Sequence, residues 1–391
     1  MVGALQITAR RSVRTLVAIV MVHPLAAQTV DRAKRSSSAD IASLWSAETE
    51  KSVAAGLAWL ASTQEPSGSW VADLGHKQDS SYRVFRTAAN LRAAGQGHMG
   101  VTALAGMAFL AGGHQPGRGR YGDVVAACLG YVLDQTSENG LLTDGYSASY
   151  SGTPMYSHAF ATLLLAEIYG MSRDRRIKEG LENAVHLIVD CQNSRGAWRY
   201  NPFSKESDLS VTVCQLQALR AARNIGIQVP KDTIDRAVRY VRDSQVQNGR
   251  YKGLFYYKIY GLSARRKPRE YAINAAAVTA LTSAGVYERA LIAPPVDFLL
   301  EESRTVMARS PDHYYFWYGN YYASQALFHA DGGDQAGIFR GYYQEIRSHL
   351  LATQQDDGRW LNTVGPGDAF STAVACIILQ VPMQYLPIFQ R

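Results

Sequence analysis

Apolar residues recur along most of the chain at the three-to-four-residue spacing of amphipathic helices. The stretch 183–226 shows this pattern clearly: two apolar-periodic segments flank a turn through Gly196 and Trp198. Ser207 or Asp208 can cap the second segment, because a short side-chain oxygen satisfies the free N–H groups at a helix start. The stretch therefore predicts a helical hairpin. A single hairpin cannot bury a core, so the rest of the chain should supply more copies.

The copies are visible as a repeated Gln-x3-Gly-x-aromatic turn. It occurs at Gln64–Gly68–Trp70, Gln192–Gly196–Trp198, Gln245–Gly249–Tyr251 and Gln354–Gly358–Trp360, with a looser copy at Gln135. Each copy follows an apolar-periodic segment and precedes one rich in Ala, Ser, Thr and Leu. A degenerate pair within 296–332 lacks the turn. The repeats predict six helix pairs, in which Gln bonds free backbone groups, Gly takes a positive φ and the aromatic ring packs over the joint.

These turns between paired helices resemble the repeats of squalene cyclases and protein prenyltransferases. The resemblance covers roughly residues 45 to 391 and implies an all-α fold, an (α/α)6 double-layered toroid. The stretches DLSVTVCQLQALRAARNIG, HYYFWYGNYYASQALF, QQDDGRW and PMQYLPIFQR are similar to an exported bacterial subgroup of prenyltransferase/squalene-oxidase repeat proteins. Small residues suit the inner helices. The insertion Val71–Gly100 is expected to form a loop over one mouth of the ring.

The chemistry of the resembled enzymes is not carried over. Triterpene cyclases use an Asp-x-Asp-Asp motif, and the matching stretch here is Lys205–Asp208, in which Ser207 stands at the proton donor's place. Zinc prenyltransferases use an Asp-x-Cys pair, and here Ser210 replaces the thiolate. The sequence therefore predicts neither activity, and we expect no metal and no cofactor.

Two residues at predicted inner-helix starts are candidate catalytic groups. Asp208 can act as an acid that faces a ligand, or simply as a helix cap. His158 can act as acid or base near neutral pH, or sit in the core. The candidate ligand-binding residues are the aromatic side chains Tyr156, Tyr314, Trp317, Tyr318, Tyr321 and Tyr322. They can line a central cavity or fill it.

Three functions remain open. The leading interpretation is a toroid that binds an apolar, isoprenoid or lipid-like ligand in an aromatic-lined central cavity. The alternatives are an (α/α)6 enzyme that acts on a glycan and a non-catalytic protein-interaction scaffold. Two carboxyl groups across a polar cleft would favour the glycan enzyme, whereas a cavity filled by side chains would favour the scaffold.

Composition and the N-terminus bound these interpretations. The 391 residues are 47% hydrophobic and 19% charged, which is enough for a large core. The formal net charge of +7 is small and is spread over the whole chain, so it does not predict nucleic-acid binding. Residues 1–27 resemble a signal peptide, with an uncleaved membrane anchor as the alternative. Residues 28–40 are predicted to be a disordered lead-in, and 41–391 a single toroid domain of unknown oligomeric state, exported to the periplasm or beyond the cell.

The four cysteines fall in helical patterns without metal-ligand spacing. Buried, apolar thiols are expected. A disulfide between Cys191 and Cys214 is left open, because pairing cannot be deduced from spacing.

Overall fold

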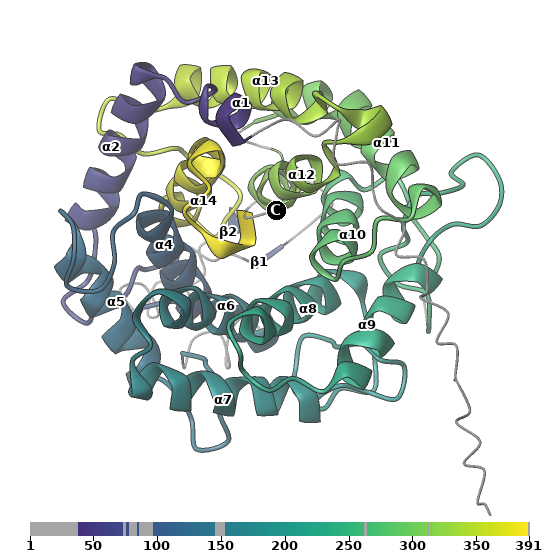
Figure 1. Cartoon of the computed structure of the whole chain (residues 1–391), viewed down its shortest axis with the longest axis horizontal. Helices are drawn as coiled ribbons and strands as arrows, with labels where there is room; N and C mark the ends of the chain where they lie inside the picture. The colour runs from purple at the N-terminus through teal and green to yellow at the C-terminus, as the bar shows by residue number, and fades with distance from the viewer. Residues whose placement is uncertain are drawn as a thin grey trace, which may run out of the picture.

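The computed structural model describes residues 38–72, 76–77, 84–85, 97–144, 153–261, 264–310, 313 and 315–389. In this part of the chain, helices alternate between an inner and an outer ring around a common axis (Figure 1). The inner ring consists of α4 (Met99–Ala111), α6 (Pro154–Ser172), α8 (Leu209–Asn224), α10 (Tyr271–Ser283), α12 (Phe316–Ala330) and α14 (Asp368–Gln380). The outer ring consists of α2 (Ala47–Ser62), α5 (Gly122–Asp134), α7 (Arg175–Asp190), α9 (Lys231–Asp243), α11 (Arg289–Met307) and α13 (Ile338–Thr353). The predicted all-α (α/α)6 toroid is confirmed.

The inner ring closes on itself. Each inner helix packs against the inner helices before and after it, and α14 packs against α4 as well as α12. Each outer helix from α5 to α13 packs against the inner helix that precedes it in the chain, and α2 packs against α14, the last inner helix (Figure 1). Closure leaves no exposed terminal repeat, which an open solenoid would have to cap with a polar face.

The two rings differ in which faces they bury. Every residue of α4 is buried, and α10 buries all but its last residue, Ser283. Both helices are rich in Ala, with Gly in α4 and Thr in α10, which lets neighbouring inner helices approach closely. The outer helix α9 instead buries one stripe around Ile234, Ala237 and Val241 and exposes charged residues on its other face. Small inner and amphipathic outer helices therefore occupy the layers that their sequences predict.

Glutamines tie each turn to the next outer helix. The Nε2 group of each donates to the carbonyl of its own turn glycine and to a carbonyl near the start of that helix, at 2.8 to 3.0 Å. The sets are Gln64–Gly68–Val124, Gln192–Gly196–Thr233 and Gln354–Gly358–Ser52. Because Gln354 reaches back to α2, this glutamine clasp also joins the last repeat to the first.

The turn glycines touch the same outer helices. Gly196 has a φ of +76°, and a Cβ there would lie 2.6 Å from the carbonyl oxygen of Arg236. A Cβ on Gly358 would lie 2.5 Å from the carbonyl oxygen of Ala55. Backbone cannot yield as a flexible side chain can, so these positions accept glycine alone.

The turn tryptophans lock each joint. Their Nε1 groups donate at 2.8 Å to carbonyls at the end of the preceding outer helix, in the pairs Trp70–Leu60, Trp198–Ile188 and Trp360–Leu350. Their backbone N–H groups donate to threonines of the following inner helix, namely Thr102, Thr212 and Thr372. One residue thus satisfies a free helix-end carbonyl and fixes the next helix.

The fourth copy departs from the predicted spacing. Gln245 donates to the carbonyl of Gly253 at 2.9 Å, not to Gly249, and it also bonds the start of α11. Phe255, which is fully buried, takes the place expected for Tyr251. Both Gly249 and Gly253 follow Gln245, so the sequence pattern could not show which of the two glycines the turn uses.

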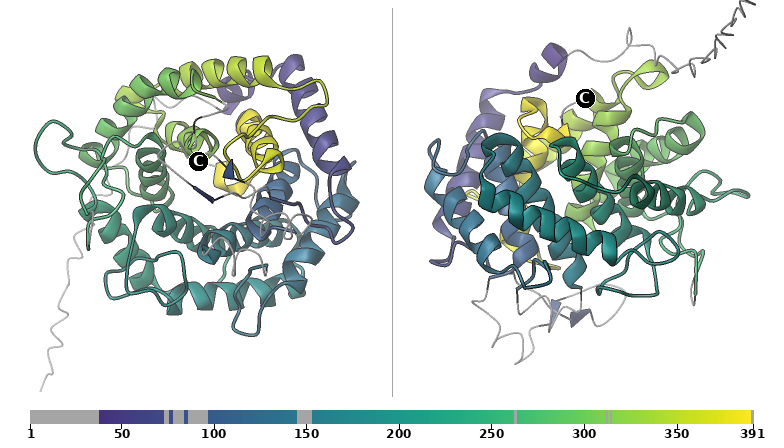
Figure 2. Two further views of the ribbon diagram at one scale, coloured as in Figure 1. Left: turned by 180° about the vertical axis from the view of Figure 1, so that it is seen from behind. Right: turned by 60° about the horizontal axis from the view of Figure 1, so that its bottom comes forward.

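Different segments lie at the two ends of the ring (Figure 2). Near the starts of the inner helices, β1 (His76–Lys77) and β2 (Val84–Phe85) form an antiparallel pair with His76 opposite Phe85. At the other end, α1 (Ser38–Ala42) packs against η4 (Val381–Met383), and η5 (Pro387–Phe389) packs against α12. The 3-10 turn η3 (Gly333–Gln335) follows α12.

Several predicted segments fall outside the described residues. They include the leader 1–27, most of the lead-in 28–40 and most of the insertion predicted to cover one mouth. In the ranges that the structure does describe, no helix has both the length and the apolar character needed to cross a membrane.

The C-terminal segment is held through both peptide groups of Ile388. The buried carboxyl group of Glu167 accepts a hydrogen bond from the Ile388 N–H, and His329 Nε2 donates to the Ile388 carbonyl at 2.9 Å. Burial raises the pKa of Glu167 to about 8. Its other oxygen, Oε2, has no hydrogen-bond partner among the described residues. Glu167 therefore keeps a proton at neutral pH, at the end of the ring opposite the helix starts.

The turn glycines can be tested with a matched pair. Gly196→Ala places a Cβ against the Arg236 carbonyl, whereas Gly249→Ala, with a φ of +84°, meets nothing within 4 Å. Both variants force an alanine into the left-handed backbone region, which costs about 1 kcal/mol. We expect Gly196→Ala to lose roughly 3 kcal/mol or more of unfolding free energy in urea. Equal losses in the two variants would contradict the backbone contact.

The buried acid predicts a pH dependence of stability. The unfolded chain releases the Glu167 proton near its ordinary pKa of 4.5, whereas the folded chain releases it near 8. The stabilisation is therefore complete below about pH 4.5 and is lost as the pH rises to 8, on the order of 5 kcal/mol in total. The unfolding free energy of Glu167→Gln should depend less on pH. It should therefore rise relative to that of the wild type between pH 5 and 8.5. A constant difference in melting temperature across this range would exclude the titration.

Candidate functional site

Asp208 stands at the start of α8, at the mouth where the inner helices begin. Its side chain is fully buried, and one oxygen, Oδ1, accepts from the Val211 N–H at 2.9 Å and from the Ser210 hydroxyl at 2.7 Å. The other oxygen forms an ion pair with Arg199, whose side chain is 19% exposed. Asp208 is thus both the helix cap and the counter-charge of a half-buried arginine.

A chain of hydroxyl groups extends from this ion pair. Arg199 donates to the Tyr257 hydroxyl at 3.0 Å, and the Tyr257 and Tyr200 hydroxyls lie 2.5 Å apart. The Arg199 guanidinium also stacks on the Tyr200 ring, 3.8 Å from its centre. Burial raises the pKa of Tyr257, and the Asp208 carboxylate raises it further. Tyr257 therefore remains neutral at physiological pH and can donate a hydrogen bond.

On its other side, Asp208 connects to the neighbouring inner helices. Ser210 bonds the Tyr156 hydroxyl from α6, and its carbonyl accepts from the Tyr318 hydroxyl of α12 at 3.3 Å. Burial and the Asp208 carboxylate raise the pKa of Tyr156. We call the set Tyr156, Arg199, Tyr200, Asp208, Ser210, Tyr257 and Tyr318 the Asp208 network. It brings together two of the predicted ligand-binding tyrosines and the predicted acid.

The predicted aromatic wall is divided between two environments. Tyr318 is half-buried in the Asp208 network, whereas Tyr321, Tyr322 and Trp317 are buried. Tyr322 packs edge-to-face on Tyr318 and Tyr321, with ring centres 4.9 Å apart in both pairs. Tyr314 lies outside the described residues. The deeper rings thus pack against one another, and their roles in ligand binding stay predictions.

His158 braces the fold. Its Nδ1 accepts from the Leu142 N–H at 3.1 Å, and its Nε2 donates to the Ala184 carbonyl at 3.2 Å. Burial lowers its pKa to about 4, so the ring is neutral. Both ring nitrogens are occupied by backbone groups, which is the arrangement of a core histidine. In this repeat the Leu142 N–H donates to His158, whereas in three other repeats the N–H of the turn tryptophan donates to a threonine. A catalytic role for His158 stays a prediction that this geometry does not favour.

Sequence reasoning missed several residues at the same mouth. Arg199, Tyr200 and Tyr257 lie in loops without a recognisable motif. Asp144, also buried, accepts from the Met99 N–H at the start of α4. It raises the pKa of His98, the α4 cap, although burial lowers that pKa by more. The only available signal was position, because each residue lies in a loop that leads to, or contacts the start of, an inner helix.

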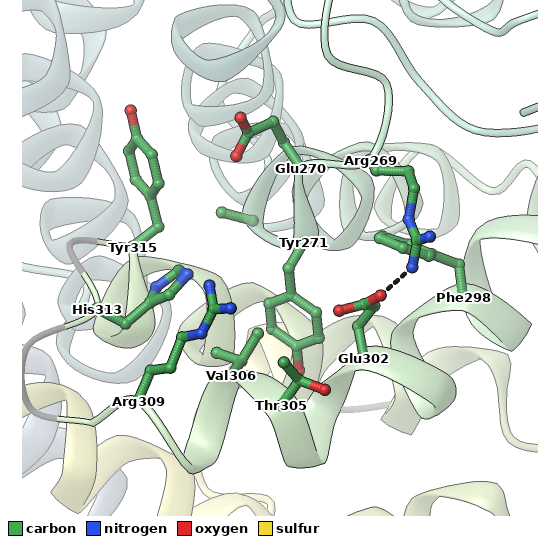
Figure 3. A pocket seen from close by; sticks show the side chains of 11 residues that line it. Arg269, Glu270, Tyr271, Phe298, Glu302, Thr305, Val306, Arg309, His313 and Tyr315 are labelled. Atoms are coloured by element: carbon green, nitrogen blue, oxygen red, sulfur yellow. Dashed lines mark hydrogen bonds and ion pairs between the residues drawn. The ribbon is translucent and has the colours of Figure 1, made fainter. Parts of the chain in front are cut away.

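Two cavities lie at the same end of the ring, and neither is lined by a residue of the Asp208 network. One, of about 190 Å3, lies where α10 and α12 begin and α11 ends (Figure 3). Its charged lining comes from Arg269, Glu270, Glu302 and Arg309, with Arg269 and Glu302 ion-paired. The other, of about 320 Å3, lies between the first and last repeats and is lined by Trp59, Trp70, Asn362 and Asp368 among others. Both have mixed polar and aromatic walls.

The cysteines are free thiols. All four are buried, so the disulfide left open for Cys191 and Cys214 is not formed. Cys214 instead contacts the Tyr322 hydroxyl at 3.1 Å, and burial raises its pKa to about 12. Within the described ranges, no three His, Cys, Asp or Glu side chains gather as metal ligands would.

The comparisons with known proteins rest on structure. No family model matches the chain, and no curated protein matches it. An alpha-1,6-mannanase of glycoside hydrolase family 76 from Salegentibacter superposes on 85% of this chain and 98% of its own, with a TM-score of 0.59 and 9% identity. A cellobiose 2-epimerase from Spirochaeta thermophila covers 85% of this chain and 96% of its own, with a TM-score of 0.56 and 12% identity.

A type II terpene cyclase from Scytonema is also similar. It covers 87% of this chain and 98% of its own, with a TM-score of 0.52 and 13% identity. At such identities the likeness shows the (α/α)6 toroid fold. The squalene-cyclase resemblance therefore holds at the level of the toroid.

The leading sequence-based interpretation, an apolar isoprenoid or lipid-like ligand, is corrected by these findings. The similar structures named as mannanases, cellobiose 2-epimerases and an alpha-amylase are glycan-active, which favours the stated alternative. The physical reason for the error is the tyrosine hydroxyl group. Sequence reasoning counted Tyr318 and Tyr322 as apolar surface, whereas their hydroxyls make polar contacts.

Asp208→Asn separates the cap from the ion pair. Asparagine still caps α8, but it leaves the Arg199 guanidinium without its counter-charge. We expect a loss of about 2–3 kcal/mol of unfolding free energy, below the value for a fully buried pair because Arg199 is partly exposed. Urea unfolding of Asp208→Asn, Arg199→Gln and the double variant checks this. Strictly additive losses would show that the two residues are not coupled.

Proposed function

We propose that this chain is a glycan-active (α/α)6 toroid whose saccharide site is the mouth around the Asp208 network. The observation that carries the proposal is the half-buried chain of hydroxyl and charged groups from Tyr200 to Tyr156, centred on the Arg199–Asp208 pair. Sugars present many hydroxyls and apolar ring faces. A lining of tyrosine rings with fixed hydroxyls matches both features.

The similar mannanases, epimerases and amylase support this proposal, because they share the toroid fold and their names give glycan substrates. For chemistry, the mouth offers two buried carboxyl groups, Asp144 and Asp208, at the starts of α4 and α8. Asp208 is held by Arg199 and suits charge stabilisation. Asp144 lies beside the neutral His98, which suits proton transfer.

We further propose that the protein is exported by its N-terminal leader and shares ancestry with the squalene-cyclase repeats. The Gln–Gly–Trp turns support the second point, because they join the repeats here through specific bonds.

The direct test is a panel of neutral oligosaccharides, namely mannotriose, cellobiose and maltotriose. Calorimetry measures binding and chromatography detects hydrolysis or epimerisation. We expect Tyr200→Phe and Tyr257→Phe, which remove only hydroxyls, to weaken binding of the best ligand by about tenfold. The matched control is Tyr385→Phe, because Tyr385 is 48% exposed and lies beyond α14, away from the helix starts.

Asp144→Asn and Asp208→Asn should abolish turnover while the circular dichroism spectrum stays helical. Full activity in both variants, or equal affinity in the tyrosine and control variants, would place the saccharide elsewhere. No binding to any glycan would refute the proposed function.

A further inference from the structure

Two loops next to the Asp208 network carry an unusual concentration of positive charge. The segment 246–269, between α9 and α10, holds seven Lys or Arg residues and no Asp or Glu. The neighbouring loop 191–208, between α7 and α8, adds exposed Arg195 and Lys205. We call the exposed cationic residues of these loops that form no ion pair, together with the two exposed rings, the basic rim, namely Arg195, Phe203, Lys205, Arg250, Lys252, Tyr260, Arg265, Arg266 and Lys267.

Most of this charge is not neutralised within the chain. Lys258 pairs with Glu206 at 3.2 Å, and Arg269 pairs with Glu302. In contrast, Arg250, Lys252 and the run 265–267 form no ion pair with any described residue, and Arg265, Arg266 and Lys267 are exposed. Arg265, Arg266 and Lys267 are consecutive in the chain, so their like charges repel one another and the rim would gain stability from a bound anion.

Exposed aromatic rings lie among these cations. Phe203 is 62% exposed and Tyr260 is 37% exposed, and the two residues lie on the two loops of the rim. The Arg195 guanidinium stacks on the Tyr260 ring, 4.3 Å from its centre, and so joins the loops. Exposed rings beside cations fit a partner that has both flat ring faces and negative groups.

The loops hold strained backbone conformations. Phe203, Arg265 and Lys267 have φ values of +57°, +54° and +49°, which non-glycine residues rarely adopt. Such strain costs about 1 kcal/mol or more per residue and concentrates at functional sites. Hydrogen bonds fix the loops in place: Arg265 N–H donates to the Lys258 carbonyl at 2.7 Å, and Asn193 Nδ2 donates to the Glu206 carbonyl at 2.8 Å.

The rim is continuous with the Asp208 network. The Tyr257 carbonyl accepts from the Leu209 N–H at 2.8 Å, and its hydroxyl accepts from Arg199. Lys258 and Arg199 both reach Glu206, at 3.2 and 3.6 Å. A polymer lying along the rim would therefore lead directly to the mouth.

We infer that the basic rim docks an anionic polysaccharide, whose carboxylate or sulfate groups pair with the exposed cations while a sugar ring stacks on Tyr260 or Phe203. This inference rests on the proposed function and names its substrate class. A nucleic acid is the competing partner. It is disfavoured because single-strand binding uses rows of stacked bases, whereas this rim has two exposed rings.

Binding to polymers of different charge tests the inference. The probes are polygalacturonate for carboxylates, dextran sulfate for sulfates, a neutral mannan and a single-stranded DNA 20-mer. The rim variant carries Arg265→Asn, Arg266→Asn and Lys267→Asn, because asparagine tolerates left-handed backbone. The control variant, Lys51→Gln, Arg118→Gln and Arg239→Gln, removes the same charge from exposed sites elsewhere.

We expect one anionic glycan to bind more tightly than the mannan, with an affinity that falls as salt rises. The rim variant should weaken that binding by about tenfold or more and leave mannan binding unchanged, whereas the control should change it less than about threefold. If polygalacturonate shows this loss of binding in the rim variant, the recognised group is a carboxylate. If dextran sulfate shows it, the group is a sulfate.

The other outcomes separate the two proposals. Equal binding of neutral and anionic glycans, or equal effects of the rim and control variants, overturns the inference and leaves the proposed function intact. DNA binding that exceeds glycan binding and is lost in the rim variant replaces the polysaccharide with a nucleic acid. Absence of binding to every glycan refutes both the inference and the proposed function.

Discussion

The toroid depends on the clasp that each turn makes with the next outer helix. A glutamine Nε2 group bridges its own turn glycine and the following helix, and the glycine itself leaves no room for a Cβ there. Because Gln64, Gln192, Gln245 and Gln354 each bond the outer helix that follows, an error in one of these joints would move the helices after it. The clasp from Gln354 to Ser52 joins the last repeat to the first, so the ring is fixed as a closed object.

Closure also explains where polar chemistry can occur. Inner helices are buried nearly all round, so their polar groups must be paired within the chain or lie at the two mouths. At one mouth, helix starts bring Asp208, Arg199 and the tyrosines together. At the other, Glu167 and His329 hold the C-terminal segment. Arg199, Tyr200 and Tyr257 at the first mouth are partly exposed, which makes that end the natural place for a hydrophilic ligand.

The sequence predicted part of the site. Asp208 was found because helix starts require caps, and Tyr156 and Tyr318 because aromatic side chains can line a central cavity. Their partners were missed. Arg199 and Tyr257 lie nine residues before and 49 residues after Asp208 in loops without a pattern. Only the folding of those loops brings Arg199 to the Asp208 carboxylate and Tyr257 to Arg199. The chemical class of the ligand was also misread, because a tyrosine forms an apolar or a polar surface according to where its hydroxyl points.

By itself the sequence determined the six helix pairs, the two layers and the three turns that keep the Gln–Gly–Trp spacing. Helical periodicity and turn chemistry are local, so they can be read from neighbouring residues. The tertiary structure decided which glycine serves the fourth turn, whether cysteines pair, which tyrosines are buried and what surrounds Asp208. Each of these depends on contacts between residues far apart in the chain, and such contacts exist only after the ring has closed.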